Sequence, residues 1–220
     1  MEKLPYEQQF DSMLTGVAAP VPTPAGRDWR SGLPSLTGSL VTLRQLRLSD
    51  APSLFAALAG HQVSGFISPP PASIEGFEKF IRWTDRMREA GQNISFAVTA
   101  KGSETAIGLY QVRSLEPGFA TAEWGFAIAA EFWGTGVFLD GAQLLLDFVF
   151  DVAGVYRLEA RASLSNGRGN GALQKLGAVN EGMLRRSLFR NGEHSDQALW
   201  TILADDRRGA RAVWSSRVIH

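Results

Sequence analysis

The 220-residue chain contains no cysteine, which excludes disulfides, thiolate zinc sites and cysteine nucleophiles. Its three histidines, His61, His194 and His220, are scattered without the spacing of a metal-binding motif, so the sequence predicts no metal site. No apolar run reaches the roughly 20 residues that cross a bilayer. The first residues, MEKLPYEQQF, lack the apolar core of a secretory signal. We therefore expect a cytoplasmic protein with no membrane partner.

The chain also lacks an excess of charge of either sign, because 22 Lys and Arg residues balance 22 Asp and Glu residues. Proteins that bind nucleic acids carry surplus basic charge, so we expect no nucleic-acid partner. Hydrophobic residues make up 45% and charged residues 20% of the chain, an ordinary globular balance. The length suits one domain with an extension.

Residues 1–37 hold five of the ten prolines. Closely spaced prolines favour extended backbone that cannot build a core of its own. We interpret this segment as an N-terminal extension that is partly disordered, or that lies on the main domain or on a second copy in a homodimer. Trp29 and Leu33 are its candidate anchors. Residues 38–206 would form the main domain and residues 207–220 a C-terminal tail.

The first half of the main domain begins with a strand over residues 40–48. Ser49-Asp50 offers the start of one helix and Ser73 the start of a second, which Gly91 ends. Three strands joined by short turns then favour an antiparallel meander: Ile94–Thr99, Ala106–Ser114 and Ala120–Ala129.

A long helix after Gly136 opens the second half. A strand over Val155–Ser163, a glycine-rich loop over residues 166–171 and a short helix over Ala172–Leu176 follow. Two last strands flank an Asn-Gly turn, Val179–Phe189 and Ser195–Leu203. The order β-α-α-β-β-β-α-β-α-β-β predicts a mixed α/β (α+β) fold, with a single, mostly antiparallel sheet of about six to seven strands and helices on both faces.

The turn Trp133-Gly134-Thr135-Gly136 joins a strand to the long helix. A helix N-terminus presents unpaired N–H groups and a positive dipole end, and glycines let a ligand approach the backbone. The turn therefore suits a phosphate, although a simple tight turn is an equal alternative. It matches neither a P-loop nor G-x-G-x-x-G. Residues 167–172 match the latter motif, but the chain lacks the repeated βαβ units of a dinucleotide domain.

Three sequence blocks follow one another at characteristic spacing. They are AEWGFAI at Ala122–Ile128, EFWGTG at Glu131–Gly136, and RLEAR at Arg157–Arg161 with Asn166 and then LQKLG at Leu173–Gly177. Together they resemble the GNAT superfamily of acyl-CoA-dependent N-acyltransferases, in the branch of RimJ/RimL-like ribosomal-protein N-terminal acetyltransferases. The resemblance covers roughly residues 40–204.

The resemblance implies that acetyl-CoA is the co-substrate and lies between two parallel strands that splay apart. Its pantetheine arm would follow the backbone of three residues of the first strand, Phe126, Ala127 and Ile128. Its pyrophosphate would lie on Trp133, Gly134, Thr135, Gly136, Val137 and Phe138. Asn166 and Gly169 would lie near the pantetheine, but Asn166 can equally cap the short helix.

Glu123 is the candidate general base, acting directly or through a water molecule. The alternative is a carboxylate in a structural ion pair with Arg157 or Arg161. The sequence also departs from the family pattern. Phe138 stands where Gly or Ala leaves room for the pyrophosphate, Thr135 replaces a usual cation, and Leu173 replaces a Tyr that serves many relatives as general acid.

We therefore expect an acetyl-CoA-dependent N-acetyltransferase. It would move the acetyl group directly to a primary amine, either a protein N-terminus or a small amine, which needs an unprotonated amine and donors for the thioester oxygen. A non-catalytic acyl-CoA-binding or interaction module is the main alternative. A third is a protein that has the fold but binds no CoA.

Overall fold

The computed structural model describes residues 28–60, 63, 69–190 and 192–207. The expectations for residues 1–27, for His61 and for the C-terminal tail from residue 208 onward lie outside the described residues.

A single mixed sheet forms the centre of the molecule, with strand order β1-β2-β3-β4-β5-β6-β8-β7. Only β5 and β6 are parallel, and every other neighbouring pair is antiparallel. The strands are β1 (Leu36–Thr37), β2 (Val41–Gln45), β3 (Asn93–Ala100), β4 (Ala106–Ser114), β5 (Thr121–Ile128), β6 (Arg157–Ser163), β7 (Val179–Arg190) and β8 (Glu193–Leu203). The predicted mixed fold and meander are confirmed. The eighth strand, β1, was not expected because two residues carry no readable periodicity.

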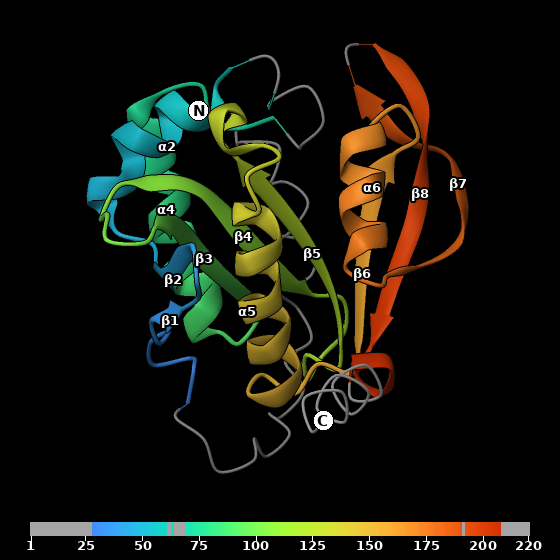
Figure 1. The fold of residues 1–220 in the computed structure, drawn as a ribbon, viewed down its shortest axis with the longest axis horizontal. Coiled ribbons are helices and arrows are strands. Elements are labelled where there is room, and N and C mark those ends of the chain that lie inside the picture. Colours follow the sequence, from blue (N-terminus) through green and yellow to red (C-terminus); the bar gives the residue numbers. More distant parts are fainter. Residues whose placement is uncertain (1–27, 61–62, 64–68, 191, 208–220) are drawn as a thin grey trace, which may run out of the picture.

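Helices cover both faces of the sheet, as predicted. They are η1 (Leu48–Asp50), α2 (Ala51–Leu58), α4 (Ile74–Glu89), η2 (Ala130–Phe132), α5 (Val137–Asp151) and α6 (Gly167–Lys175). Figure 1 shows α5 in front of the central strands and α6 in front of β6 and β8. One core cluster lies between α5, α6 and the sheet, and a second lies between α2, α4 and the opposite face.

Local signals explain the ends of α4 and the beginning of α5. The Ser73 hydroxyl accepts the N–H of Gly76 at 3.1 Å, which caps α4. Gly91 follows α4 in the left-handed region, with φ +70°. Gly136 is left-handed at φ +90° and directly precedes α5, so the helix begins where the glycine turn predicts.

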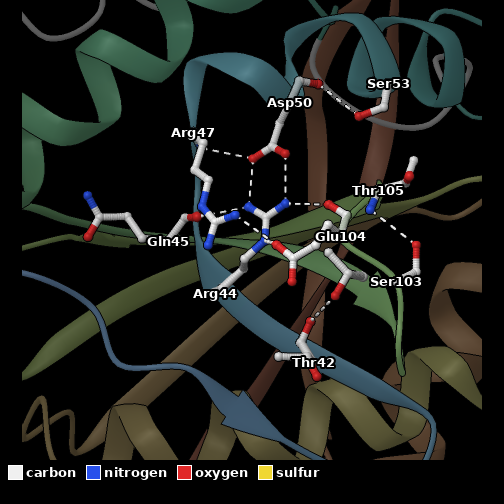
Figure 2. A network of polar contacts seen from close by, with 10 residues as sticks. Thr42, Arg44, Gln45, Arg47, Asp50, Ser53, Ser103, Glu104 and Thr105 are labelled. Atoms are coloured by element: carbon white, nitrogen blue, oxygen red, sulfur yellow. Dashed lines mark hydrogen bonds and ion pairs between the residues drawn. The ribbon is translucent and has the colours of Figure 1, made fainter.

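The helix predicted from Ser49-Asp50 begins with a 3₁₀ turn, η1, and continues as α2. Asp50 lies at the junction, where its carboxylate accepts the N–H of Arg47 at 2.8 Å and two hydrogen bonds from the Arg44 guanidinium, both at 2.8 Å. Figure 2 shows this pair beside Glu104, whose backbone carbonyl accepts a further Arg44 hydrogen bond at 2.6 Å. The buried ion pair therefore ties β2 to the start of α2 and to the turn before β4.

The prediction of a glycine-rich loop over residues 166–171 is wrong, because α6 already begins at Gly167. Glycine is a poor helix former, so local propensity argues against this helix. A local N-cap and a tertiary contact hold it instead. Asn166 caps its first turn, and the Trp200 indole on β8 donates to the Asn170 side chain at 2.8 Å.

The described part of the N-terminal extension packs on the main domain. Trp29 is 1% exposed, and its ring lies 5.2 Å from that of Phe119. The N–H of Leu33 donates to Gln45 at 3.1 Å, and the guanidinium of Arg88 donates to the carbonyl of Arg30. Trp29 and Leu33 therefore do anchor this segment, and β1 at its end joins the sheet.

Candidate active site

The two parallel strands β5 and β6 separate part of the way along their length. They pair only from Thr121↔Arg157 to Glu123↔Glu159. Beyond that point β5 stays paired with β4 as far as Ile128, and β6 stays paired with β8 as far as Ser163. Figure 1 shows the strands diverging. The edge of β5 after Glu123 that faces β6 is therefore outside the strand ladder and can pair with an extended ligand.

The turn that follows β5 presents open backbone. Gly134 and Gly136 have φ of +79° and +90°, and a side chain at Gly134 would meet no atom within 4 Å. Thr135 is exposed, and its hydroxyl donates back to the carbonyl of Phe132 at 2.7 Å. Directly after this turn, α5 begins at Val137. Exposed N–H groups at the start of a 15-residue helix fit a phosphate group.

The ring of Phe138 packs toward the sheet. Its centroid lies 4.5 Å from that of Phe126, 6.2 Å from Tyr110 and 6.5 Å from Trp124. The Tyr110 hydroxyl donates to the carbonyl of Phe138 at 2.8 Å. Burial, with the charge of Asp140 nearby, raises the pKa of Tyr110 well above its usual range, so this hydroxyl remains a donor. Phe138 thus belongs to an aromatic cluster between α5 and the sheet.

Trp133 links the turn to β5 and to α6. Its indole N–H donates to the carbonyl of Ile128 at 2.9 Å, so one of the three residues predicted to follow the pantetheine has its carbonyl engaged. On the other side, the guanidinium carbon of Arg168 in α6 lies 4.5 Å from the Trp133 ring centroid. Sequence analysis did not single out Arg168, which lies inside the segment interpreted as a loop.

Asn166 precedes α6 and acts as its N-cap. The side-chain oxygen accepts the N–H of Gly169 at 2.8 Å. Gly169 is buried, and a Cβ there would collide with the Asn166 amide, so the glycine permits this cap. The capping alternative is therefore confirmed, while contact with a pantetheine stays a prediction. Leu173 in the same helix is 1% exposed in the core, where it offers no acid.

Glu123 lies at the point where β5 and β6 separate. Its side chain is 16% exposed, and Oε2 accepts hydrogen bonds from Arg161 on β6, at 2.8 Å, and from Arg113 on β4. The ion-pair alternative is thus present with Arg161. The suggested Arg157 partner is wrong, because Arg157 instead contacts Glu159 at 2.9 Å and Glu181 at 2.9 and 2.6 Å.

Arg113 is a neighbour of the candidate residue Glu123 that sequence analysis missed. The signal was available, since the turn at Glu116-Pro117-Gly118 sets the register that places Arg113 opposite Glu123. With it, six side chains alternate in sign across four strands: Arg113, Glu123, Arg161, Glu159, Arg157 and Glu181. Ala122 and Trp124, on either side of Glu123, pack toward α5, so Glu123 points to the opposite, α2/α4 face.

The end of this charged row at β7 is strongly paired. Hydrogen bonds from Arg157 and then from Thr201 lower the pKa of Glu181 to about 2. The same Glu181 contact, followed by that of Glu159, raises the pKa of Arg157. The Arg157–Glu181 pair therefore stays ionised at neutral pH, and its charge-assisted hydrogen bonds hold this end of the row in position.

A cavity of about 550 Å³ lies between α2 and the end of β7. Its lining is Phe55, Ala59, Pro69, Pro70, Pro71, Ala72, Phe189 and Arg190. The nearby polar residues of the β7–β8 hairpin hold the hairpin itself. Asp196 accepts the N–H of Arg186 at 2.7 Å, and the His194 ring lies 4.8 Å from that of Phe189. The lining residues other than Arg190 are thus apolar in type, while backbone atoms and Arg190 make the cavity surface about as polar as apolar.

The described part of the chain holds neither a cluster of metal-ligating side chains nor a membrane-spanning helix. Residues 28–60, 63, 69–190 and 192–207 contain no group of three or more acidic or histidine side chains that could hold a metal ion. Among the same residues, no helix has both the length and the apolar character needed to span a membrane.

Comparison with known proteins agrees with this geometry. The family described as the acetyltransferase (GNAT) domain matches residues 41–179, more than half of the chain. "Uncharacterized N-acetyltransferase YoaA" of Bacillus subtilis (strain 168) is 25% identical over 171 residues, covering 77% of this chain and 97% of the relative.

Solved structures show the same fold. A GCN5-related N-acetyltransferase from Brucella melitensis superposes with a TM-score of 0.69 at 23% identity, covering 84% of this chain and 83% of that one. Mycobacterium smegmatis RimJ, solved in complex with CoA-disulfide, gives a TM-score of 0.71 at 19% identity, covering 78% and 88%. The chain belongs to the GNAT acetyltransferase family and is an acyltransferase by that membership.

Proposed function

We propose that this protein transfers an acetyl group from acetyl-CoA to a primary amine, and that it belongs to the RimJ/RimL-like branch of the family. The observation that carries the proposal is the separation of β5 from β6 immediately before the glycine turn at the start of α5. An extended arm and a phosphate can thus be bound along one continuous path of β5 backbone and turn. The CoA-disulfide bound to RimJ, a protein of the same fold, supports this assignment.

The residues of this path fit the parts of acetyl-CoA in order. The free edge of β5 at Phe126 and Ala127 would pair with the amides of the pantetheine arm. The turn from Trp133 to Phe138 would hold the pyrophosphate through its N–H groups. Acetyl-CoA would supply the activated thioester, and these residues of the chain would bind and orient it.

Glu123 lies beside the expected position of the thioester, at the closed end of the separated strands. Two guanidinium groups fix one of its oxygens, and a carboxylate has about four lone-pair sites in all. We propose that the carboxylate uses its other lone pairs to accept a proton from the acceptor amine, directly or through a water molecule. Arg113 and Arg161 then act as positioning residues.

The cavity between α2 and β7 is the candidate site for the rest of the acceptor. The apolar side chains in its lining, such as Phe55 and Phe189, fit an uncharged side chain or small hydrophobic group next to the amine. Both a peptide N-terminus and a small amine satisfy this description. Measuring transfer to peptides and to small amines distinguishes the two kinds of acceptor.

The test has two stages. Calorimetric titration with acetyl-CoA and with free CoA should give saturable binding of both. Release of free CoA thiol should then accelerate when peptides with different first residues, or small amines, are added. Binding without transfer to any amine would favour the non-catalytic alternative. If neither CoA species binds, the proposal is wrong and a GNAT scaffold without CoA is favoured.

A further inference from the structure

The turn proposed to hold the pyrophosphate carries no cation of its own. Between Trp133 and Phe138 the chain has neither Lys nor Arg, and the exposed Thr135 carries no charge. Coenzyme A carries a pyrophosphate and a 3′-phosphate, both strongly anionic. Backbone N–H groups and a helix dipole offer only partial positive charge. A nearby cation from another part of the chain would complete the site.

Arg168 is placed to supply that charge. It lies in the first turn of α6, which follows β6, whereas Trp133 lies in the turn that follows β5. Its guanidinium carbon is 4.5 Å from the centroid of the Trp133 ring, so the side chain spans the separation between the two strands. The contact between Arg168 and Trp133 thus joins the proposed phosphate turn to α6 through a charged group.

The pairing of Arg168 differs from that of the other arginines near the site. Arg113, Arg157 and Arg161 each form an ion pair with a glutamate. Among the described residues, no carboxylate lies within 4.0 Å of the Arg168 guanidinium, and the side chain is exposed. Its positive charge is therefore available to an anion.

The surroundings hold Arg168 in this position. The indole hydrogen bond to Ile128 fixes the plane of the Trp133 ring, and the Asn166 cap fixes the first turn of α6. A guanidinium stacked on an aromatic ring keeps its N–H groups at its edge, where they can donate to a phosphate. Stacking also reduces the entropy that a free arginine would lose on binding.

We infer that Arg168, stacked on Trp133, binds a phosphate of CoA and supplies the cation that the turn lacks. The inference rests on the proposed function, since it concerns the same CoA site. It assigns a specific role to a residue of α6, so that CoA binding couples the two halves of the sheet on either side of the β5–β6 separation.

Calorimetric titration with CoA tests this inference without requiring turnover. Arg168→Gln should weaken CoA binding about tenfold, the value of one charge-assisted hydrogen bond. It should also flatten the dependence of the dissociation constant on salt concentration, because one screened charge pair is lost. Arg168→Lys keeps the charge and should recover part of the affinity. Arg185→Gln, an exposed arginine on β7, is the matched control and should bind CoA like the wild type.

Dephospho-CoA identifies the phosphate. An equal loss for CoA and dephospho-CoA would assign Arg168 to the pyrophosphate, whereas a loss confined to CoA would assign it to the 3′-phosphate. An Arg168→Gln variant that binds CoA with wild-type affinity overturns the inference but leaves the proposed function intact. The inference is also overturned if the Lys and Gln variants lose equal CoA affinity and the salt dependence of the dissociation constant is unchanged. That result would indicate that Arg168 acts through packing alone. A wild-type protein that binds no CoA overturns both.

Discussion

The carboxylate of Asp140, in the first turn of α5, binds the N–H of Leu40 at 2.8 Å, although the two residues are 100 positions apart in the chain. The same carboxylate accepts the N–H of Val41 at 3.0 Å and of Ser39 at 3.1 Å. The backbone before β2 is thereby fixed to the helix that begins at the proposed phosphate turn. Gly38 allows the close approach, because a Cβ there would collide with the Asp140 carboxylate.

Asp140→Ala should lower the free energy of unfolding by about 2 kcal/mol, because three N–H groups lose a charged acceptor. Denaturant unfolding measures this loss. Glu131→Gln, an exposed carboxylate just before the turn, serves as the control and should change stability by less than about 0.5 kcal/mol. Equal stability of the Asp140→Ala variant and the wild type would show that water replaces the carboxylate without cost.

The buried pair of Arg44 and Asp50 gives a second test of stability (Figure 2). Their side chains are 6% and 4% exposed, and the two hydrogen bonds between them are both 2.8 Å long. Asp50→Ala should cost about 3–5 kcal/mol, because it leaves a buried guanidinium without its partner. The double variant Arg44→Met/Asp50→Leu should be clearly more stable than Asp50→Ala. If the double variant is no more stable than Asp50→Ala, the hydrogen bonds of Asp50 to the backbone contribute more to stability than the charge pair does.

Glu123→Gln tests the catalytic proposal. Loss of a general base should reduce kcat by about 100-fold or more. The dissociation constant for acetyl-CoA should stay near the wild-type value, because the proposed role of Glu123 is to accept a proton from the acceptor amine and not to bind CoA. Arg113→Gln is the companion variant and should cause a smaller loss, since it only frees the carboxylate to move. Unchanged turnover of Glu123→Gln across pH would leave Glu123 with a structural role alone.

Substitutions at Asn166 separate helix capping from ligand binding. Asp is as good an N-cap as Asn, so Asn166→Asp should keep its stability, whereas Asn166→Ala should lose about 1 kcal/mol. The Asp variant lacks the amide N–H groups and adds a negative charge, so it should bind CoA more weakly than the wild type. Thermal unfolding and calorimetric titration give the two readouts. Wild-type affinity in Asn166→Asp would restrict this residue to capping.

The ion pair of Glu181 with Arg157 predicts a dependence of stability on pH. Because the pKa of Glu181 falls to about 2 in the folded protein, its contribution is complete above the ordinary carboxyl pKa of 4.5 and is lost as the pH falls toward 2. The pair is partly exposed, so we expect only about 1 kcal/mol. The difference in stability between wild type and Glu181→Gln should therefore be constant from pH 7 to 5 and shrink below pH 4. A difference that does not change with pH would assign the effect to neutral hydrogen bonding.

Several parts of the fold could be predicted because their causes are local. The short turns at residues 101–103 and 116–118 dictate the β3–β4–β5 meander, and the hydroxyl of Ser73 marks the first turn of α4. Gly134 and Gly136 likewise predict the open turn at the start of α5. In each case the deciding interaction joins residues only a few positions apart.

The sequence by itself determined the class of the protein: a mixed sheet with helices on both faces, and a strand, turn and helix suited to a phosphate. Only the tertiary structure decided that Arg161 and not Arg157 reaches Glu123, that residues 167–171 are helical, and that Arg168 lies on Trp133. These outcomes depend on strand register and on side chains from segments far apart in the chain. Local propensity cannot encode them, because each contact exists only once the sheet has assembled.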